Sequence, residues 1–199
     1  MPQVSAQEFH RLPLRVHRFL AGVPLHDVWA VDLPRPRAGI TLNEFLQAET
    51  NRPHSLSPVV RMLLNIRFFV GRIFGWDREP NSSSWETFAT RLTPADRSSS
   101  LAPAGTREGF FRIVYRFQNE QLLELINQTA HAAAVSALVE MENTYRFYFA
   151  VYVRDVSPFT PVYMAAIDPF RKLVVYPSLL RSVRTGWNQA FVDVMTVAD

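Results

Sequence analysis

The sequence of 199 residues contains no cysteine. This absence excludes a disulfide scaffold, a thiolate metal site and a cysteine nucleophile, and it fits a reducing compartment. Lysine is almost absent too, because Lys172 is the single lysine among 21 basic residues and the others are arginine. The net charge is only +3 and the arginines are scattered along the chain. A nucleic-acid-binding protein normally gathers its basic residues on one face, so we expect no nucleic-acid partner.

Glycine and long apolar runs are scarce as well. Seven glycines leave little material for a phosphate-binding loop, and the motifs GxGxxG, GxxxxGK[ST] and GxSxG do not occur. The N-terminus lacks the apolar region of a signal peptide, and no stretch reaches the ~18–20 uncharged apolar residues of a membrane span. The histidines show no spacing typical of metal ligands. We therefore expect a cytoplasmic protein without a membrane span, a metal or a cofactor.

The composition of the chain is typical of a globular protein, since 48% of its residues are apolar and 13% are aromatic. Its length suits one domain with a sizeable core. We assign residues 25–194 to this domain and residues 1–24, which carry Pro13 and Pro24, to an irregular N-terminal arm. Residues 78–109 are rich in serine and proline, and we expect a long loop there whose role the sequence leaves open.

Helical patterns lie on both sides of this loop. Residues 41–49 predict a short helix, and the segment 57–77 predicts an amphipathic helix near 58–74. Residues 159–193 predict a long C-terminal helix. Because proline removes a backbone donor, we expect this helix to kink or break at Pro169 and Pro177.

Apolar residues alternate with polar ones in five other segments, which predict β-strands. The first is residues 26–34, and the others are 110–118, 121–128, 131–141 and 144–156. The last four follow one another across short turns and predict an antiparallel meander with one covered face. The C-terminal helix is the best candidate for the cover, so we expect an α+β fold.

Four phrases of the sequence resemble a known family. They are PLHDVWAVDLP, MLLNIRFFVGRIFGWD, the strand with Thr129 and His131, and YMAAIDPFRKLVVYPSLLRSVR. Over roughly residues 20–188 they resemble the bacterial family called domain of unknown function 2867, which looks like a branch of the START-like (SRPBCC) superfamily. The resemblance implies a helix-grip fold, in which a curved antiparallel sheet wraps around a long C-terminal helix. It also implies a hydrophobic cavity between sheet and helix, but no reaction, because the superfamily shares no catalytic set.

Two polar residues are candidates for a ligand site. Arg67 lies on the apolar face of the helix expected at 57–77, where it could hold a carboxylate or phenolate. The plainer interpretation is that it forms an ion pair, for example with Asp168 or Glu124, or extends past its neighbours to water. His131 lies in an alanine-rich strand, where it could act as an acid or base or simply be a hydrogen-bonded core residue.

Aromatic side chains supply the remaining candidates for lining a pocket. We expect six of them to line it: Trp29, Trp76, Tyr115, Phe117, Phe149 and Tyr163. The plainer interpretation is that most of them belong to the core. Asp168 precedes a proline, and we expect it to cap the continuation of the last helix.

These observations leave three functions open. The first is a protein that binds an apolar or aromatic small molecule between the sheet and the C-terminal helix. The second is an enzyme of the cyclase, dehydratase or isomerase type that acts on such a ligand, with His131 or Tyr115 transferring a proton. The third is a protein-interaction module with a filled core. The sequence alone identifies neither the ligand nor the oligomeric state.

Overall fold

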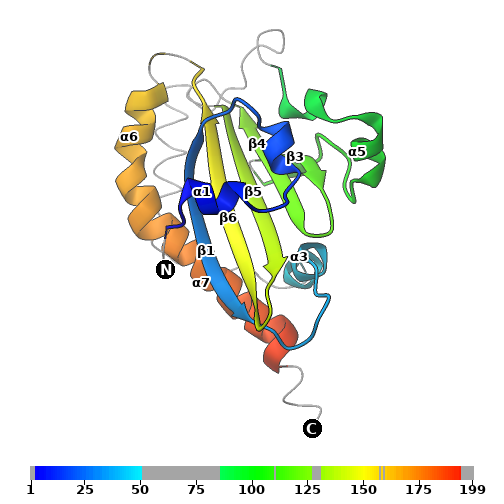
Figure 1. Ribbon diagram of the computed structural model, residues 1–199. Coiled ribbons are helices and arrows are strands. Elements are labelled where there is room, and N and C mark those ends of the chain that lie inside the picture. Colours follow the sequence, from blue (N-terminus) through cyan, green and yellow to red (C-terminus); the bar gives the residue numbers. More distant parts are fainter. Residues whose placement is uncertain are drawn as a thin grey trace.

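The computed structural model describes residues 3–50, 86–109, 111–126, 131–156, 158 and 160–193. Six strands form one antiparallel sheet in the order β1-β6-β5-β4-β3-β2 (Figure 1). Their bounds are β1 (Leu25–Pro34), β2 (Arg107–Glu108), β3 (Phe111–Arg116), β4 (Glu120–Ile126), β5 (His131–Glu140) and β6 (Thr144–Arg154). The predicted meander is confirmed as β3 to β6, and β1 pairs with β6 beside it.

The helical elements lie before, between and after the strands, so the fold is of the α+β class. Before the meander they are α1 (Ala6–His10), α2 (Val16–Phe19), α3 (Leu42–Thr50), the 3₁₀ turn η1 (Phe88–Arg91) and α5 (Pro94–Ser99). After it they are α6 (Thr160–Phe170), the π-helical turn η2 (Arg171–Val175), α7 (Tyr176–Trp187) and the π-helical turn η3 (Asn188–Val192). No helix in the described ranges is both long enough and apolar enough to cross a membrane.

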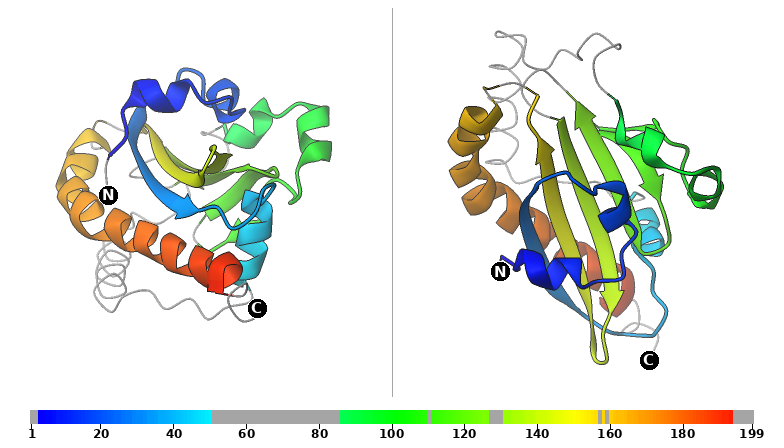
Figure 2. Two further views of the ribbon diagram at one scale, coloured as in Figure 1. Left: turned by 60° about the horizontal axis from the view of Figure 1, so that its bottom comes forward. Right: turned by 45° about the horizontal axis from the view of Figure 1, so that its top comes forward.

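Helices cover both faces of the sheet, which corrects the expectation of one covered face. Figure 2 shows α1 and α2 on one side of the sheet and α6 and α7 on the other. We call the side under α1, α2 and η1 the N-terminal face, and the side under α3, α6 and α7 the C-terminal face. Side chains alternate between them along β1, where Val28 and Ala30 join the core of the N-terminal face and Trp29 joins that of the C-terminal face.

The N-terminal segment is part of the core. The expected irregular arm contains α1 and α2, and Phe9 and Phe19 from these helices are no more than 1% exposed. Ser5 begins α1 by accepting a hydrogen bond from the Glu8 amide, as an N-cap serine does. Apolar side chains of both helices thus cover the N-terminal face, whereas the expectation was that the C-terminal helix alone covers the sheet.

The C-terminal segment remains helical through both prolines. Pro169 lies in the last turn of α6, Pro177 lies in the first turn of α7, and the wider π turn η2 lies between them. Each proline removes one backbone donor, so the hydrogen-bond ladder changes spacing at this point instead of ending. The expectation that Asp168 caps a new helix is therefore wrong, because Asp168 lies inside α6 and no helix begins there.

Two other expectations concern the part of the chain between α3 and β3. The amphipathic helix predicted in the segment 57–77, near 58–74, lies outside the described residues. Of the loop expected at 78–109, residues 86–109 contain η1, α5 and the short strand β2. A capping box between Thr93 and Asp96 begins α5, so this part is more structured than a plain loop.

Candidate functional site

The residues predicted to line a single pocket are divided between the two faces of the sheet. Tyr115, Phe117 and His131 belong to the N-terminal face, while Trp29 and Phe149 belong to the C-terminal face. Three others cannot be compared: Arg67 and Trp76 lie outside the described residues, and Tyr163 lies in α6 with its side chain outside them. The five described side chains therefore do not form one site.

His131 is fully buried and has a carboxylate partner. Its Nε2 lies 2.7 Å from Oε1 of Glu124, which comes from the neighbouring strand and points to the same face. Glu124 also accepts hydrogen bonds from the Thr87 hydroxyl and, at 2.6 Å, from the Phe88 amide. The Phe88 ring stacks on the imidazole at 4.1 Å. This arrangement matches the plainer interpretation of a hydrogen-bonded core histidine, which here holds η1 on the sheet.

Tyr115 is also enclosed in the core of the N-terminal face. A register shift between Ile113 and Tyr115 places both Val114 and Tyr115 in this core, which simple alternation does not predict. The Tyr115 ring packs 5.0 Å from that of Phe19. Burial raises the pKa of Tyr115 well above its usual value, so this hydroxyl is poorly suited to transfer a proton near neutral pH.

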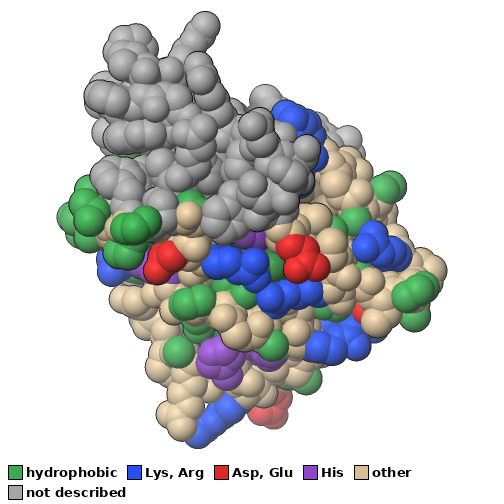
Figure 3. Space-filling view, turned by 90° about the horizontal axis from the view of Figure 1, so that it is seen from above, with side chains coloured by type: hydrophobic (Ala, Val, Ile, Leu, Met, Phe, Trp, Pro, Cys, Tyr) green, Lys and Arg blue, Asp and Glu red, His purple; other side chains and the backbone are tan. Residues whose placement is uncertain are grey.

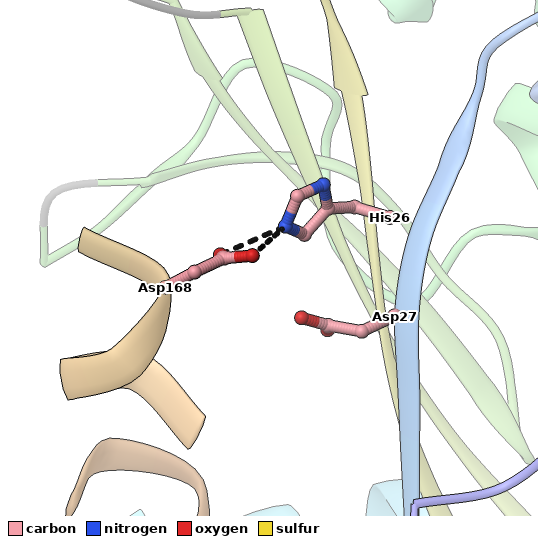
Figure 4. A group of neighbouring side chains, drawn as sticks. All are labelled: His26, Asp27 and Asp168. Carbon is pink, nitrogen blue, oxygen red and sulfur yellow. Dashed lines mark hydrogen bonds and ion pairs between the residues drawn. The ribbon is translucent and has the colours of Figure 1, made fainter. Parts of the chain in front are cut away.

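A polar cluster on the C-terminal face is the most distinctive arrangement of charged groups in the described structure. It consists of His26 and Asp27 at the start of β1, Asp168 in α6, Arg171 in η2 and Tyr176 in α7. Figure 4 shows the two carboxylates and the imidazole turned toward one another across the gap between strand and helix. Segments about 140 residues apart in the chain meet here, since His26 and Asp168 are 142 positions apart.

Arg171 joins the two carboxylates of this cluster. Its Nη1 lies 3.0 Å from Oδ1 of Asp168, and its Nη2 lies 3.4 Å from Oδ2 of Asp27. The Tyr176 hydroxyl accepts a hydrogen bond from Arg171 and donates one to Oδ2 of Asp27 at 3.2 Å. On the other side, His26 Nε2 lies 2.8 Å from Asp168 Oδ1. The cluster is thus one connected network.

The two carboxylates have opposite pKa shifts. Burial raises the pKa of Asp27, whose side chain is fully buried, and the nearby Arg171, His26 and Tyr176 only partly offset it. Burial also acts to raise the pKa of Asp168, but hydrogen bonds and charges from His26, Arg171 and Lys172 together hold it below its usual value. Asp168 is therefore the firmly ionised member, and Asp27 is the carboxylate that burial perturbs.

Both segments of the polar cluster lie inside a match to a known family. A family model described as "Protein of unknown function (DUF2867)" matches residues 19–178, which is more than half of the chain. The chain belongs to this family. A search of the curated proteins and a search of the solved structures found no match.

In this DUF2867 chain, the polar cluster was not predicted from the sequence. A local signal existed, because Arg171 and Lys172 follow Asp168 at the i+3 and i+4 spacing that places charges on one helix face. Nothing in the sequence indicated that Asp27 and His26 lie against that face. The family resemblance indicated these residues only indirectly. His26–Asp27 and the Asp168–Tyr176 segment each lie in one of the four sequence phrases that resemble the family.

The polar cluster includes a possible set of metal ligands. One ligand atom each from His26, Asp27 and Asp168 lies within 4.8 Å of the others. However, the same carboxylates already bind the guanidinium of Arg171 and, at 3.3 Å from Asp168, the ammonium of Lys172. A divalent cation would have to compete with these two fixed positive charges. The residues present therefore fit a polar organic group better than a metal ion.

The two faces of the DUF2867 sheet are sealed to different degrees. On β5, five residues point to the N-terminal face; His131, Ala133, Val135 and Ala137 are 0% exposed, and Val139, near the end of the strand, is half-buried. On the C-terminal face, five side chains near the sheet centre remain half-buried: Leu123, Leu125, Ala132, Ser136 and Phe149. The same strands are thus closed on one side and partly accessible on the other.

Figure 3 shows the charged side chains on one face of the described surface. On the face shown in Figure 3, Lys and Arg side chains are scattered over the described surface, and acidic side chains lie among them. This distribution contrasts with the polar cluster, where two carboxylates and two cations are held in fixed contacts. The cluster and the half-buried part of the C-terminal face are therefore the features from which a function can be argued.

Proposed function

We propose that this protein binds an apolar or aromatic small molecule between the C-terminal face of the sheet and helices α6 and α7. The observation that supports this proposal is the difference between the two faces: the centre of the N-terminal face is closed, whereas several side chains at the centre of the C-terminal face remain half-buried. The proposal includes a START-like (SRPBCC) helix-grip fold, which the antiparallel sheet and C-terminal helices support. A cytoplasmic location, in keeping with the lack of cysteine, is part of it.

Small side chains form the floor of the proposed site. Ala132, Ala134 and Ser136 point to the C-terminal face from the middle of the sheet, and all three side chains are small, as the proposed site requires. Aromatic side chains stand beside this floor, with the Trp29 and Phe149 rings 5.2 and 5.9 Å from that of Tyr176. A ligand that buries about 200 Å² of apolar surface there would gain about 5 kcal/mol before the costs of association.

An enzyme acting on such a ligand is the second candidate. A cyclase, dehydratase or isomerase needs a group that can exchange a proton beside the ligand. On the C-terminal face this group would be Asp27, whose burial raises its pKa, and not His131 or Tyr115, which lie on the opposite face. Turnover of a ligand identified by binding, and its loss in an Asp27→Asn variant, would favour this candidate.

Two matched substitutions test the binding proposal. Ala132→Leu would fill the floor, and Ala95→Leu makes the same change at an exposed position of α5. Ligands would be sought first by native mass spectrometry of the purified protein. Added probes would then be fatty acids, quinones and 2-naphthol, with binding followed by calorimetry.

We expect Ala132→Leu to weaken binding at least about tenfold, which corresponds to 1.4 kcal/mol, and Ala95→Leu to leave it unchanged. A wild-type protein that carries no ligand and binds none of these probes would contradict the proposal. Equal affinities of wild type and Ala132→Leu would show that binding occurs elsewhere. In the first case the interaction-module hypothesis becomes the better one.

A further inference from the structure

Among the buried polar atoms that have no hydrogen-bond partner in the described part of the chain, two belong to the side of β1 that faces the C-terminal helices. They are Oδ1 of Asp27 and Nε1 of Trp29. Asp27 is 3% exposed and Trp29 is 8% exposed, so water does not reach these atoms freely. Buried polar atoms are nearly always paired in native proteins, because an unpaired one loses its hydrogen bonds to water without replacement. These two atoms therefore indicate a missing partner.

The two atoms belong to one local arrangement. Asp27 and Trp29 are alternate residues of β1, so their side chains leave the strand on the same face, about 7 Å apart along it. Tyr176 connects them, since its hydroxyl donates to Oδ2 of Asp27 and its ring lies 5.2 Å from the Trp29 ring. Tyr176 is thus a shared neighbour of the Asp27 and Trp29 side chains.

The chemistry of the two atoms is complementary. A carboxylate oxygen only accepts hydrogen bonds, and an indole N–H only donates one. On Asp27 the other oxygen, Oδ2, already receives the Tyr176 hydroxyl and the Arg171 guanidinium, which leaves Oδ1 as the open acceptor. The missing partner must therefore donate to Asp27 and accept from Trp29.

We propose that the ligand presents an uncharged hydroxyl, as in a phenol, enol or alcohol, to Oδ1 of Asp27 and Nε1 of Trp29. This inference rests on the proposed function. A hydroxyl both donates and accepts, as the two atoms require. A ligand carboxylate has no proton for Asp27 and would add a third negative charge beside Asp27 and Asp168. The cations Arg171 and Lys172 are already bound to those two carboxylates.

Three probes of similar shape separate these possibilities. The probes are 2-naphthol, 2-methylnaphthalene, in which a methyl replaces the hydroxyl, and 2-naphthoate. For wild type we expect 2-naphthol to bind about tenfold more tightly than 2-methylnaphthalene, with 2-naphthoate the weakest. Trp29→Phe removes the indole donor and keeps an aromatic ring. It should reduce the preference for the hydroxyl severalfold and leave the affinity for 2-methylnaphthalene nearly unchanged.

Asp27→Asn gives a sharper test, because it replaces a hydrogen-bond acceptor with a donor at one position of the side chain. Arg171 and Tyr176 both donate to this side chain, so the amide oxygen should face them and the amide NH₂ should take the place of Oδ1. The open acceptor then becomes a donor, and 2-naphthoate should gain affinity relative to 2-naphthol. Asp32→Asn is the matched control, since Asp32 is exposed and lies on the same strand but points to the other face.

The outcomes distinguish the inference from the proposed function. If 2-naphthol and 2-methylnaphthalene bind wild type equally, or if Trp29→Phe and Asp27→Asn both leave the ratios unchanged, the inference is overturned while binding itself stands. If wild type binds none of the three probes, the proposed function and the inference both fall. Circular dichroism establishes that each variant is folded, and Trp29→Phe keeps the test decisive should Asp27→Asn not fold.

Discussion

Glu124 shows how much one side chain can organise in this protein. Its carboxylate is buried on β4 and receives hydrogen bonds from the Thr87 hydroxyl, the Phe88 amide and the His131 ring. Burial acts to raise the pKa of Glu124, but these three donors together hold the pKa below its usual value of 4.5. The ionised form is therefore stabilised in the folded protein relative to the unfolded chain.

This arrangement predicts a pH-dependent effect of Glu124→Gln. A depressed pKa contributes stability above the unfolded value near 4.5, and this contribution is lost as the pH falls through the lower folded value. At pH 7 we expect Glu124→Gln to lower the free energy of unfolding by about 1–3 kcal/mol, with the difference from wild type shrinking below pH 4.5. Urea unfolding at several pH values measures both quantities.

Glu142→Gln provides the control, because Glu142 is exposed in the turn between β5 and β6. We expect it to change the free energy of unfolding by no more than about 0.5 kcal/mol at any pH. A Glu124→Gln effect that stayed constant between pH 7 and pH 3 would contradict the assignment of this carboxylate as ionised in the folded protein.

At the scale of elements, helix α2 depends on a strand for its stability. It contains only four residues, which is too short to be stable alone. The buried carboxylate of Glu120, on β4, accepts hydrogen bonds from the amide of Arg15 at 3.0 Å and from that of Val16 at 3.5 Å. These are amides at the helix start that would otherwise lack partners, so Glu120 acts as an N-cap supplied from another element.

Glu120→Ala should release this helix while leaving the sheet intact. We expect faster hydrogen exchange at the amides of residues 15–20 and a loss of about 1–3 kcal/mol in the free energy of unfolding. Exchange in the middle of β5 and β6 should stay slow. Hydrogen-exchange mass spectrometry resolves the two regions, with Glu142→Ala as the exposed control. Uniformly faster exchange over the sheet would mean that Glu120 supports the whole core and not one helix.

The positions of the strands were easier to predict from the sequence than the elements that cover them. Period-two alternation of apolar and polar residues predicted the strands between 111 and 154. Their pairing could also be predicted, because strands joined by short turns pair with one another. The two-sided burial was overlooked, although runs such as VWAV in β1 and AAAV in β5 are typical of strands buried on both faces. The position of Tyr115 could not be predicted, since one register shift reverses the face of every later side chain.

The site was harder to predict than the fold for a physical reason. Its key contacts join β1 to η2 and α7, and Asp27 and Arg171 are 144 positions apart. Periodicity reports which face of its own element a residue occupies, and it carries no information on which distant element will cover that face. His131 illustrates the same limit, because its partner Glu124 comes from the neighbouring strand and no adjacent carboxylate indicated it.

On the scale of the whole molecule, the core extends beyond the family match. The match covers residues 19–178, but Phe9, Val16, Leu180 and Trp187 lie outside it and are all 0% exposed. Phe9 and Val16 close the N-terminal face, while Leu180 and Trp187 close part of the C-terminal face. Trp187 is also fixed by a hydrogen bond from its Nε1 to the carbonyl of Pro34 at 2.9 Å.

A chain trimmed to residues 19–178 should therefore fail to fold cooperatively. Burying each of these four side chains contributes about 1.5–3 kcal/mol, so their sum is comparable to the whole stability of a typical domain, about 5–15 kcal/mol. Thermal unfolding followed by near-ultraviolet circular dichroism would show a sharp transition for the full chain and none for the trimmed one.

Single substitutions in the full chain separate the contributions of the two faces to the free energy of unfolding. We expect Phe9→Ala and Trp187→Ala each to cost about 3–5 kcal/mol, because each leaves a cavity in a different core. Their effects should be nearly additive, since the sheet separates the two side chains. A trimmed chain that unfolded sharply at the same temperature as the full one would mean that the matched segment is a complete folding unit. The closed N-terminal face would then not depend on α1, and the contrast between the two faces would need another origin.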